Sequence, residues 1–331
     1  MKPLEETNRQ GPAAAKFSKE SLRGILLPFT TPFSSGGEVD ARALRSNIAK
    51  WNETGVSGYV ALGSTGERVH LEEHECLEVI EAARDAVPER LAFIVGAGQQ
   101  STRATINEVR RFADAGADAL LVITPNFYRK AMTHEALVSH YSAVADASSV
   151  PVVLYSVPDL TGLAIAPETV ARLSLHENIV GIKDSSADLV NLVETLRLVP
   201  DDFMVLTGNA PLLYAALSAG AHGAILAAGC VAARLCRDLF GALEAGEHQR
   251  ARDLQRRLTP LARAVTTRYG IGGLKAALDI IGYFGGGVRA PLGLPGEDER
   301  REIARLLEEA DCSGQERAGE DGFRLAGART S

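Results

Sequence analysis

The sequence predicts a (β/α)8 barrel followed by a helical C-terminal extension. Eight short apolar runs lie along the chain, and they are continuous rather than alternating, which is typical of strands buried on both faces. Helical patterns separate these runs, and eight strands alternating with helices is the arrangement of this barrel. The competing fold, a doubly wound open sheet, favours a GxGxxG turn after the first strand, where this chain has TTPFSSGG.

The elements follow in order from the residue pattern. We place the eight strands at 23–29, 57–62, 91–96, 118–124, 150–157, 178–184, 202–208 and 222–227. The helix after the first strand ends at Gly55, a residue type suited to close a helix. The next helix stops at Pro88, and the third begins at a Ser/Thr cap and closes at Gly116.

Four segments are predicted along the chain. The polar residues 1–20 are expected to form a disordered tail, and residues 21–227 the barrel, whose last helix follows. Residues 228–311 read as helix only, so we expect them to pack beside the barrel and part of them to serve an oligomer interface. The Gly/Ser/charge-rich residues 312–331 are expected to form a second disordered tail.

Composition narrows the function classes. Acidic residues number 42 and basic residues 35 in 331, a balance that disfavours a nucleic-acid partner, which needs clustered cations. No apolar run approaches the ~18 residues of a membrane span, and the first residues lack an apolar signal core. The four cysteines form no CxxC pair, so we expect neither disulfides nor a zinc site, and a cytoplasmic location.

Two candidate residues end predicted strands, where a barrel places its active site. Lys183 closes NIVGIK, and a desolvated lysine has a lowered pKa and can attack a carbonyl to form a Schiff base. An ion pair with Asp184 or another acid is the plainer interpretation. Tyr155, near the end of the preceding strand, could shuttle protons beside that lysine or could simply be a core residue.

A third candidate is the turn GSTGE at residues 63–67. Its glycines and hydroxyl residues could expose backbone N–H groups that hold a carboxylate, although such turns are common. His70 and His74 are four residues apart and could be a metal pair on one helical face, but no third ligand is evident. We therefore do not expect a metal at this pair.

Taken together, YVALGSTGE, YSVPDLTG and GIKDS resemble the dihydrodipicolinate synthase / N-acetylneuraminate lyase family, from about Arg23 to about Pro295. The resemblance implies a (β/α)8 class I aldolase, a homotetramer built as a dimer of dimers, and pyruvate bound as an imine without a cofactor. The resemblance also assigns roles. Lys183 matches the lysine that forms the imine and Tyr155 the proton-transfer tyrosine. The pair that holds the pyruvate carboxylate is matched by Ser64 and Thr65, and a position whose backbone faces the keto acid by Ile225.

Several positions bear on the substrate. Leu160 stands where dihydrodipicolinate synthases usually carry an arginine for aspartate semialdehyde. The residues that match the lysine-feedback pocket also depart from the usual His, His, Asn and Tyr; they are Glu73, Cys76, Gln100 and Asn126. Gly208 and Asn209 replace the acidic pair with which N-acetylneuraminate lyases grip sugar hydroxyls. We count Leu160, Gly208 and Asn209 as substrate-binding candidates, and these departures disfavour lysine biosynthesis and a polyol substrate.

The stretches VPVVLYSVPDLTGL, ENIVGIKDSSAD and GADALLVITP are most similar to 4-hydroxy-2-oxoglutarate aldolases, in which the residue matching Ser185 lies at the site. The resemblance thus implies cleavage of 4-hydroxy-2-oxoglutarate to pyruvate and glyoxylate. Alternatives are a 2-keto-3-deoxy sugar acid aldolase or dehydratase, 4-hydroxy-tetrahydrodipicolinate synthase, and a catalytically silent barrel used as a binding protein.

Two loop features remain open. Phe127 matches a position where many relatives supply a tyrosine hydroxyl to a neighbouring subunit, and Tyr128 is next to it. Arg68, Arg129 and Lys130 lie on predicted loops after the second and fourth strands and could bind a second carboxylate. An equal alternative is that these three are surface charges.

Overall fold

A closed barrel of eight parallel strands forms the centre of the molecule, in the order β1 to β8. The computed structural model describes residues 17–312. Each strand lies within the run predicted for it, apart from β3, which extends one residue further. The strands are β1 Gly24–Pro28, β2 Gly58–Ala61, β3 Ala92–Ala97, β4 Ala119–Ile123, β5 Val152–Ser156, β6 Ile179–Asp184, β7 Met204–Thr207 and β8 Gly223–Ile225. The predicted fold class is confirmed.

Two apolar layers explain why the runs are continuous. Leu26, Val60, Leu121 and Leu206 belong to a cluster that fills the barrel interior. The alternate residues of the same strands, such as Leu27, belong to a larger cluster that includes the surrounding helices. A strand with both faces buried has no polar position to alternate with.

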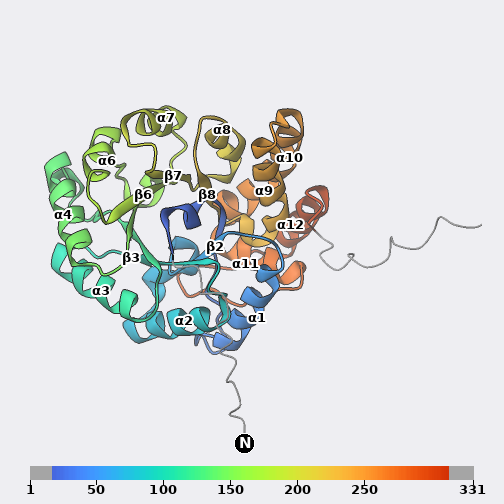
Figure 1. Ribbon diagram of the computed structural model, residues 1–331. Coiled ribbons are helices and arrows are strands. Elements are labelled where there is room, and N and C mark those ends of the chain that lie inside the picture. Colours follow the sequence, from blue (N-terminus) through green and yellow to red (C-terminus); the bar gives the residue numbers. More distant parts are fainter. Residues whose placement is uncertain (1–16, 313–331) are drawn as a thin grey trace, which may run out of the picture.

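The helices surround the strands (Figure 1). They are α1 Ala41–Asn52, α2 Glu73–Ala86, α3 Thr102–Asp114, α4 His134–Ala147, α5 Pro158–Thr161, α6 Pro167–Leu173, α7 Leu189–Leu198, α8 Leu213–Ser218 and α9 Gly229–Glu244. The predicted end signals are confirmed: Ser101 caps α3 by accepting from the Ala104 N–H, and Gly55 and Gly116 have positive φ. α2 ends at Ala86, just before Pro88.

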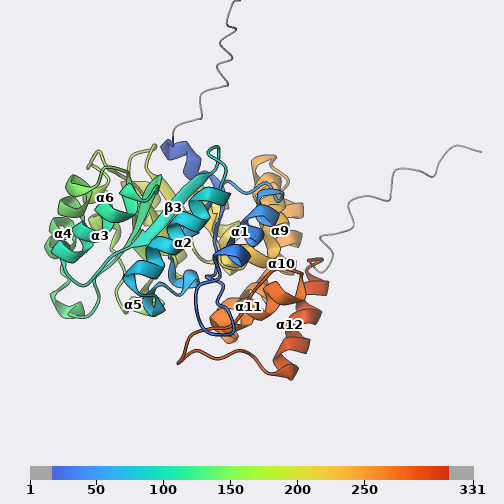
Figure 2. The ribbon, with the colours of Figure 1, turned by 90° about the horizontal axis from the view of Figure 1, so that it is seen from below.

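The C-terminal region continues as helices α10 His248–Ala262, η6 Arg263–Arg268, α11 Gly270–Ile280 and α12 Glu297–Glu309, with η6 a π-helix. α11 and α12 lie on the side of the barrel that carries α5, which follows a strand end (Figure 2). This region therefore flanks the end of the barrel where the polar strand termini lie.

The predicted tails fall mostly outside the described residues, namely at 1–16 and 313–331. A short helix, η1 Lys19–Leu22, begins within the stretch predicted as the first tail, because Leu22 is buried in the barrel interior. Within residues 17–312, no helix is both long and apolar enough to span a bilayer. All four cysteines are buried free thiols.

Candidate active site

The sheet register brings two of the predicted residues together. β5 pairs with β6 so that Tyr155 lies directly beside Lys183. Both side chains are buried, and the Lys183 Nζ atom lies 4.4 Å from the centre of the Tyr155 ring. Lys183 forms no ion pair within residues 17–312, and the neighbouring Asp184 carboxylate accepts instead from the Ser186 N–H at 2.8 Å. The ion-pair interpretation of Lys183 is therefore not supported.

The GSTGE turn reaches the same place from another strand. After β2, Ser64–Gly66 form a short helix, η2, and the Ser64 Oγ lies 3.2 Å from the Tyr155 hydroxyl oxygen. Thr65 follows and is buried. The Ser64 and Tyr155 hydroxyl groups therefore link the turn after β2 to the strand residue beside Lys183.

Ser185 completes this group because Gly208 leaves it room. A Cβ atom at Gly208 would lie 1.9 Å from the Ser185 Oγ and 2.8 Å from the Lys183 Cε, so any larger residue would displace these two side chains. Asn209 donates from its side chain to the Ser186 carbonyl, 3.3 Å away, and so joins the loops after β6 and β7. Ile225 lies in the interior cluster that also contains Tyr155.

These contacts change the acidity of Tyr155. Burial raises the pKa of its phenol, but the nearby Lys183 ammonium and hydrogen bonding with Ser64, Ser185 and Lys183 outweigh burial, so the pKa lies below its ordinary value. A phenol with a lowered pKa ionises more readily, and its phenolate form can accept a proton.

A cavity of about 430 Å³ opens above Ser64 and Tyr155. Its walls are largely apolar, and Leu160 stands at its rim with 63% of its surface exposed. The other large aliphatic wall residues are Leu62, Val69, Leu121, Ile123, Ile271 and Leu292. A larger surface hollow, about 920 Å³ beside α9 and α10, contains none of the candidate residues. The cavity above Tyr155 is therefore the candidate substrate site.

The three basic candidates have different surroundings. Arg68 lines the cavity, but it is mostly buried and forms an ion pair with Glu108, so it is neither a surface charge nor an unmatched receptor. Arg129 and Lys130 are exposed in η4, Arg129–Ala131. Arg129 lies against Gly162, where a Cβ atom would be 2.4 Å from its Nη1, and forms no ion pair within residues 17–312.

Neither aromatic residue of the β4 loop lines the cavity in the described chain. Phe127 and Tyr128 are exposed and contact each other edge to face, with ring centres 5.1 Å apart. Gln100 holds this loop by accepting from the N–H groups of Asn126 and Phe127 at 2.9 and 2.8 Å. Gln100 therefore fixes the position of the loop after β4, and a role of Phe127 or Tyr128 in proton transfer stays a prediction.

The histidine pair does not share a helical face. His70 lies in η3, Arg68–His70, whereas His74 lies at the start of α2. Within residues 17–312, no group of three or more His, Cys, Asp or Glu residues is arranged to hold a metal ion. Sequence reasoning missed a different cluster, in which Glu67 pairs with the fully buried Lys275. A charged residue inside the apolar helix sequence GLKAAL was a signal that could have found it.

Comparisons with known proteins place the chain among relatives of the same fold. The model of the dihydrodipicolinate synthetase family matches residues 21–310. A protein of Syntrophus aciditrophicus named 4-hydroxy-tetrahydrodipicolinate synthase is 36% identical over 287 residues, covering 87% of this chain and 98% of its own. The structure of dihydrodipicolinate synthase from Thermotoga maritima superposes with a TM-score of 0.83 at 30% identity, covering 88% of this chain and 99% of that one. YagE of E. coli K12, solved in complex with pyruvate, gives 0.82 at 28% identity with the same coverage.

Proposed function

Because the chain belongs to the dihydrodipicolinate synthetase family, and is a carbon–carbon lyase of the class I aldolase type, we propose that Lys183 forms a Schiff base with pyruvate. The observation that carries the proposal is the position of Lys183, buried without an acid partner among the described residues, 4.4 Å from the ring of Tyr155. No carboxylate holds the Lys183 amine in an ion pair among the described residues, and a lysine amine can attack a ketone carbonyl to form a Schiff base.

The residues divide the chemistry as follows. The Lys183 amine attacks C2 of the keto acid, and the carbonyl oxygen leaves as water. The C3–C4 bond then breaks, its electron pair moves into the imine, and the C4 hydroxyl loses its proton. Tyr155, hydrogen-bonded to Ser64, accepts and returns protons. Protonation of C3 and hydrolysis of the imine release pyruvate and regenerate the lysine.

The turn at Ser64 and Thr65 is the proposed site for the pyruvate carboxylate. N–H groups at the first turn of a helix have no partner within that helix, and hydroxyl groups add further donors. Ser185, Ile225, Gly208 and Asn209 are proposed to surround the keto acid, since Ser185 and Gly208 meet beside the Lys183 side chain.

We propose 4-hydroxy-2-oxoglutarate, cleaved to pyruvate and glyoxylate, as the first substrate to test. The similarity of VPVVLYSVPDLTGL, ENIVGIKDSSAD and GADALLVITP to 4-hydroxy-2-oxoglutarate aldolases supports this substrate. Arg129 is the better candidate for the second carboxylate, because Glu108 already neutralises Arg68. Synthesis of 4-hydroxy-tetrahydrodipicolinate is the second candidate, favoured by the name of the 36% identical relative. A 2-keto-3-deoxy sugar acid is the third.

Two assays test these proposals separately. Borohydride reduction in the presence of pyruvate should label Lys183, as mapped by peptide mass spectrometry, whereas a label on another lysine contradicts the imine assignment. Pyruvate release from 4-hydroxy-2-oxoglutarate, coupled to lactate dehydrogenase, should yield glyoxylate in equal amount. Trapping without release would retain the imine and reject this substrate, and condensation with aspartate semialdehyde then tests the second candidate.

We also propose a homo-oligomer, with a dimer of dimers as its expected form. Apolar side chains are exposed on the segments that follow β2, β4 and β5 and would be covered in an assembly; they are Val69, Phe127, Tyr128 and Leu160. Light scattering coupled to size exclusion tests this, and a monomer at micromolar concentration contradicts it. The cytoplasmic location stays a prediction.

A further inference from the structure

Glu67, the last residue of the GSTGE turn, has a backbone conformation that needs support from its neighbours. It directly follows η2 and has φ of 56°, in the left-handed region that residues with a side chain seldom occupy. Its carboxylate is buried, with 1% of the side chain exposed. A strained backbone beside reactive groups persists only when surrounding contacts hold it.

The C-terminal region supplies those contacts from α11. The Lys275 Nζ lies 2.5 Å from the Glu67 carboxylate and donates to the Gly287 carbonyl at 2.6 Å. It also lies 4.3 Å from the ring centre of Phe33, in the loop after β1. Lys275 is completely buried, so the pair is shielded from solvent.

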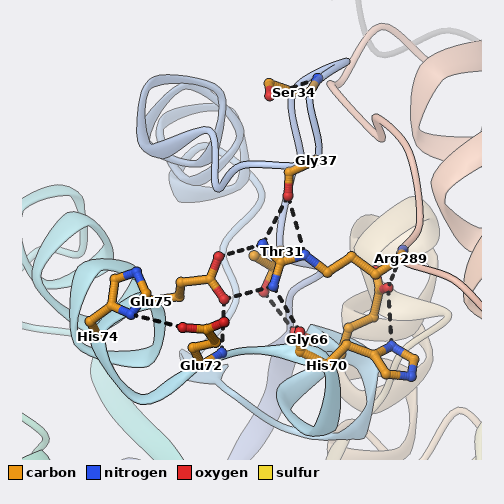
Figure 3. Close-up of polar contacts among 11 residues, drawn as sticks. Thr31, Ser34, Gly37, Gly66, His70, Glu72, His74, Glu75 and Arg289 are labelled. Atoms are coloured by element: carbon orange, nitrogen blue, oxygen red, sulfur yellow. Dashed lines mark hydrogen bonds and ion pairs between the residues drawn. The ribbon is translucent and has the colours of Figure 1, made fainter.

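Arg289 contacts the residues that follow this turn, among them His70 and Glu75 (Figure 3). Its backbone N–H donates to the Glu67 carboxylate at 3.3 Å, and its Nη1 donates to the His70 carbonyl at 2.7 Å. The guanidinium also binds the Glu75 carboxylate, and its Nη2 donates to the Gly37 carbonyl at 2.8 Å. The Thr31 hydroxyl, in the loop after β1, donates to the Gly66 carbonyl of the turn at 2.7 Å.

We propose that the buried pair Glu67–Lys275, braced by Arg289, is a positioning device that holds the Ser64 hydroxyl at Tyr155 for proton transfer. The proposal rests on the proposed function, because it concerns the step that follows imine formation. Lys183 and Tyr155 stand on strands β6 and β5, whose ladder fixes them. Ser64 stands on a short turn after β2, and its place depends on the C-terminal contacts.

The proposal separates two steps of one reaction. Imine formation needs the Lys183 amine, which the pair does not touch in the described structure. Removal of a proton from the pyruvate methyl group needs Tyr155 and Ser64 in register. Loss of the pair should therefore slow methyl proton exchange and leave borohydride trapping intact. A residue that only stabilised the fold would affect both steps through the fraction folded.

The experiment follows pyruvate in D2O by proton NMR, so that no aldehyde need be known. Lys275→Met, Glu67→Gln and the double variant are compared with the wild type, with trapping measured in parallel. We expect methyl exchange to fall about tenfold or more in folded Lys275→Met, since small misplacements of catalytic groups cost rates of this order. The double variant leaves neither Glu67 nor Lys275 as a buried charge without its partner, so it should fold where Lys275→Met does not, and it should exchange slowly as well.

Arg84→Met is the matched control, because Arg84 forms a partly buried ion pair with Asp118, away from the cavity. It should lower thermal stability and leave exchange unchanged. Wild-type exchange in the folded pair variants overturns the positioning role, as does an equal loss of exchange in Arg84→Met. Failure of the wild type to trap pyruvate instead overturns the proposed function, on which the positioning role depends.

Discussion

Two buried lysines stand in contrasting surroundings. Lys183, at the end of β6, forms no ion pair among the described residues, whereas Lys275, in α11, is paired with Glu67 and donates to Gly287. Burial lowers the pKa of Lys275, and the Glu67 carboxylate opposes that shift. Burial alone therefore does not distinguish the two lysines, and the difference lies in the carboxylate partner, which stabilises the ammonium form of Lys275.

The sharpest test of this comparison applies the same substitution to both lysines. Lys183→Met should reduce turnover by about 10⁴-fold or more, because no other group supplies the imine nitrogen. Its stability to urea should be unchanged or raised, since an unpaired buried amine is replaced by a side chain without charge. Normal turnover, or a marked loss of stability, would break the contrast with Lys275.

Tyr155→Phe should give the next largest effect. We expect kcat to fall by about 10²–10⁴-fold because the proton acceptor is lost while ring packing remains. Trapping of pyruvate at Lys183, measured with borohydride, should persist in this variant. A kcat equal to that of the wild type would remove the phenol from the mechanism.

Lys275→Met should lower the free energy of unfolding, in contrast to Lys183→Met. Leaving Glu67 buried without its partner should cost about 3–5 kcal/mol of unfolding free energy, measured in urea. The double variant Glu67→Gln/Lys275→Met should recover a large part of this loss. If Lys275→Met is as stable as Lys183→Met, the ion pair does not support the turn.

His140 extends the comparison to a third buried basic side chain. Its Nδ1 hydrogen-bonds to the Thr102 hydroxyl, and burial lowers its pKa to about 4. The unfolded state therefore binds the proton more tightly, so stability is complete above pH ~6.5 and declines as the pH falls toward 4. We expect the lowered pKa of His140 to reduce the free energy of unfolding by about 2 kcal/mol at pH 5. In His140→Gln, the free energy of unfolding measured in urea should depend less steeply on pH. An unaltered slope would contradict this.

Arg129→Ala should have the smallest effect. If Arg129 receives the second carboxylate, KM for 4-hydroxy-2-oxoglutarate should rise about tenfold with pyruvate trapping unchanged. Lys130→Ala, also exposed in η4, is the matched control. Equal effects in both variants would indicate only a general electrostatic attraction.

The barrel could be predicted from the sequence because each strand buried on both faces appears as a continuous apolar run. The run NIVGIK is apolar on both faces up to Lys183, and a charged residue at that point could only mark a strand end. Strand order and register then placed Tyr155 beside Lys183, as predicted for neighbouring strands. The surroundings of the arginines could not be predicted, because Arg68 finds Glu108 on α3, forty positions away along the chain.

The sequence by itself determined the fold class, the strand that carries or precedes each candidate residue, and the end of the barrel where these strands finish, because periodicity and strand order are local properties of the chain. Only the tertiary structure decided which charges are paired. Glu67 and Lys275 are separated by most of the barrel in sequence, yet they share one buried contact 2.5 Å long. Such pairing depends on three-dimensional distance and desolvation, and neither is encoded in any single stretch of residues.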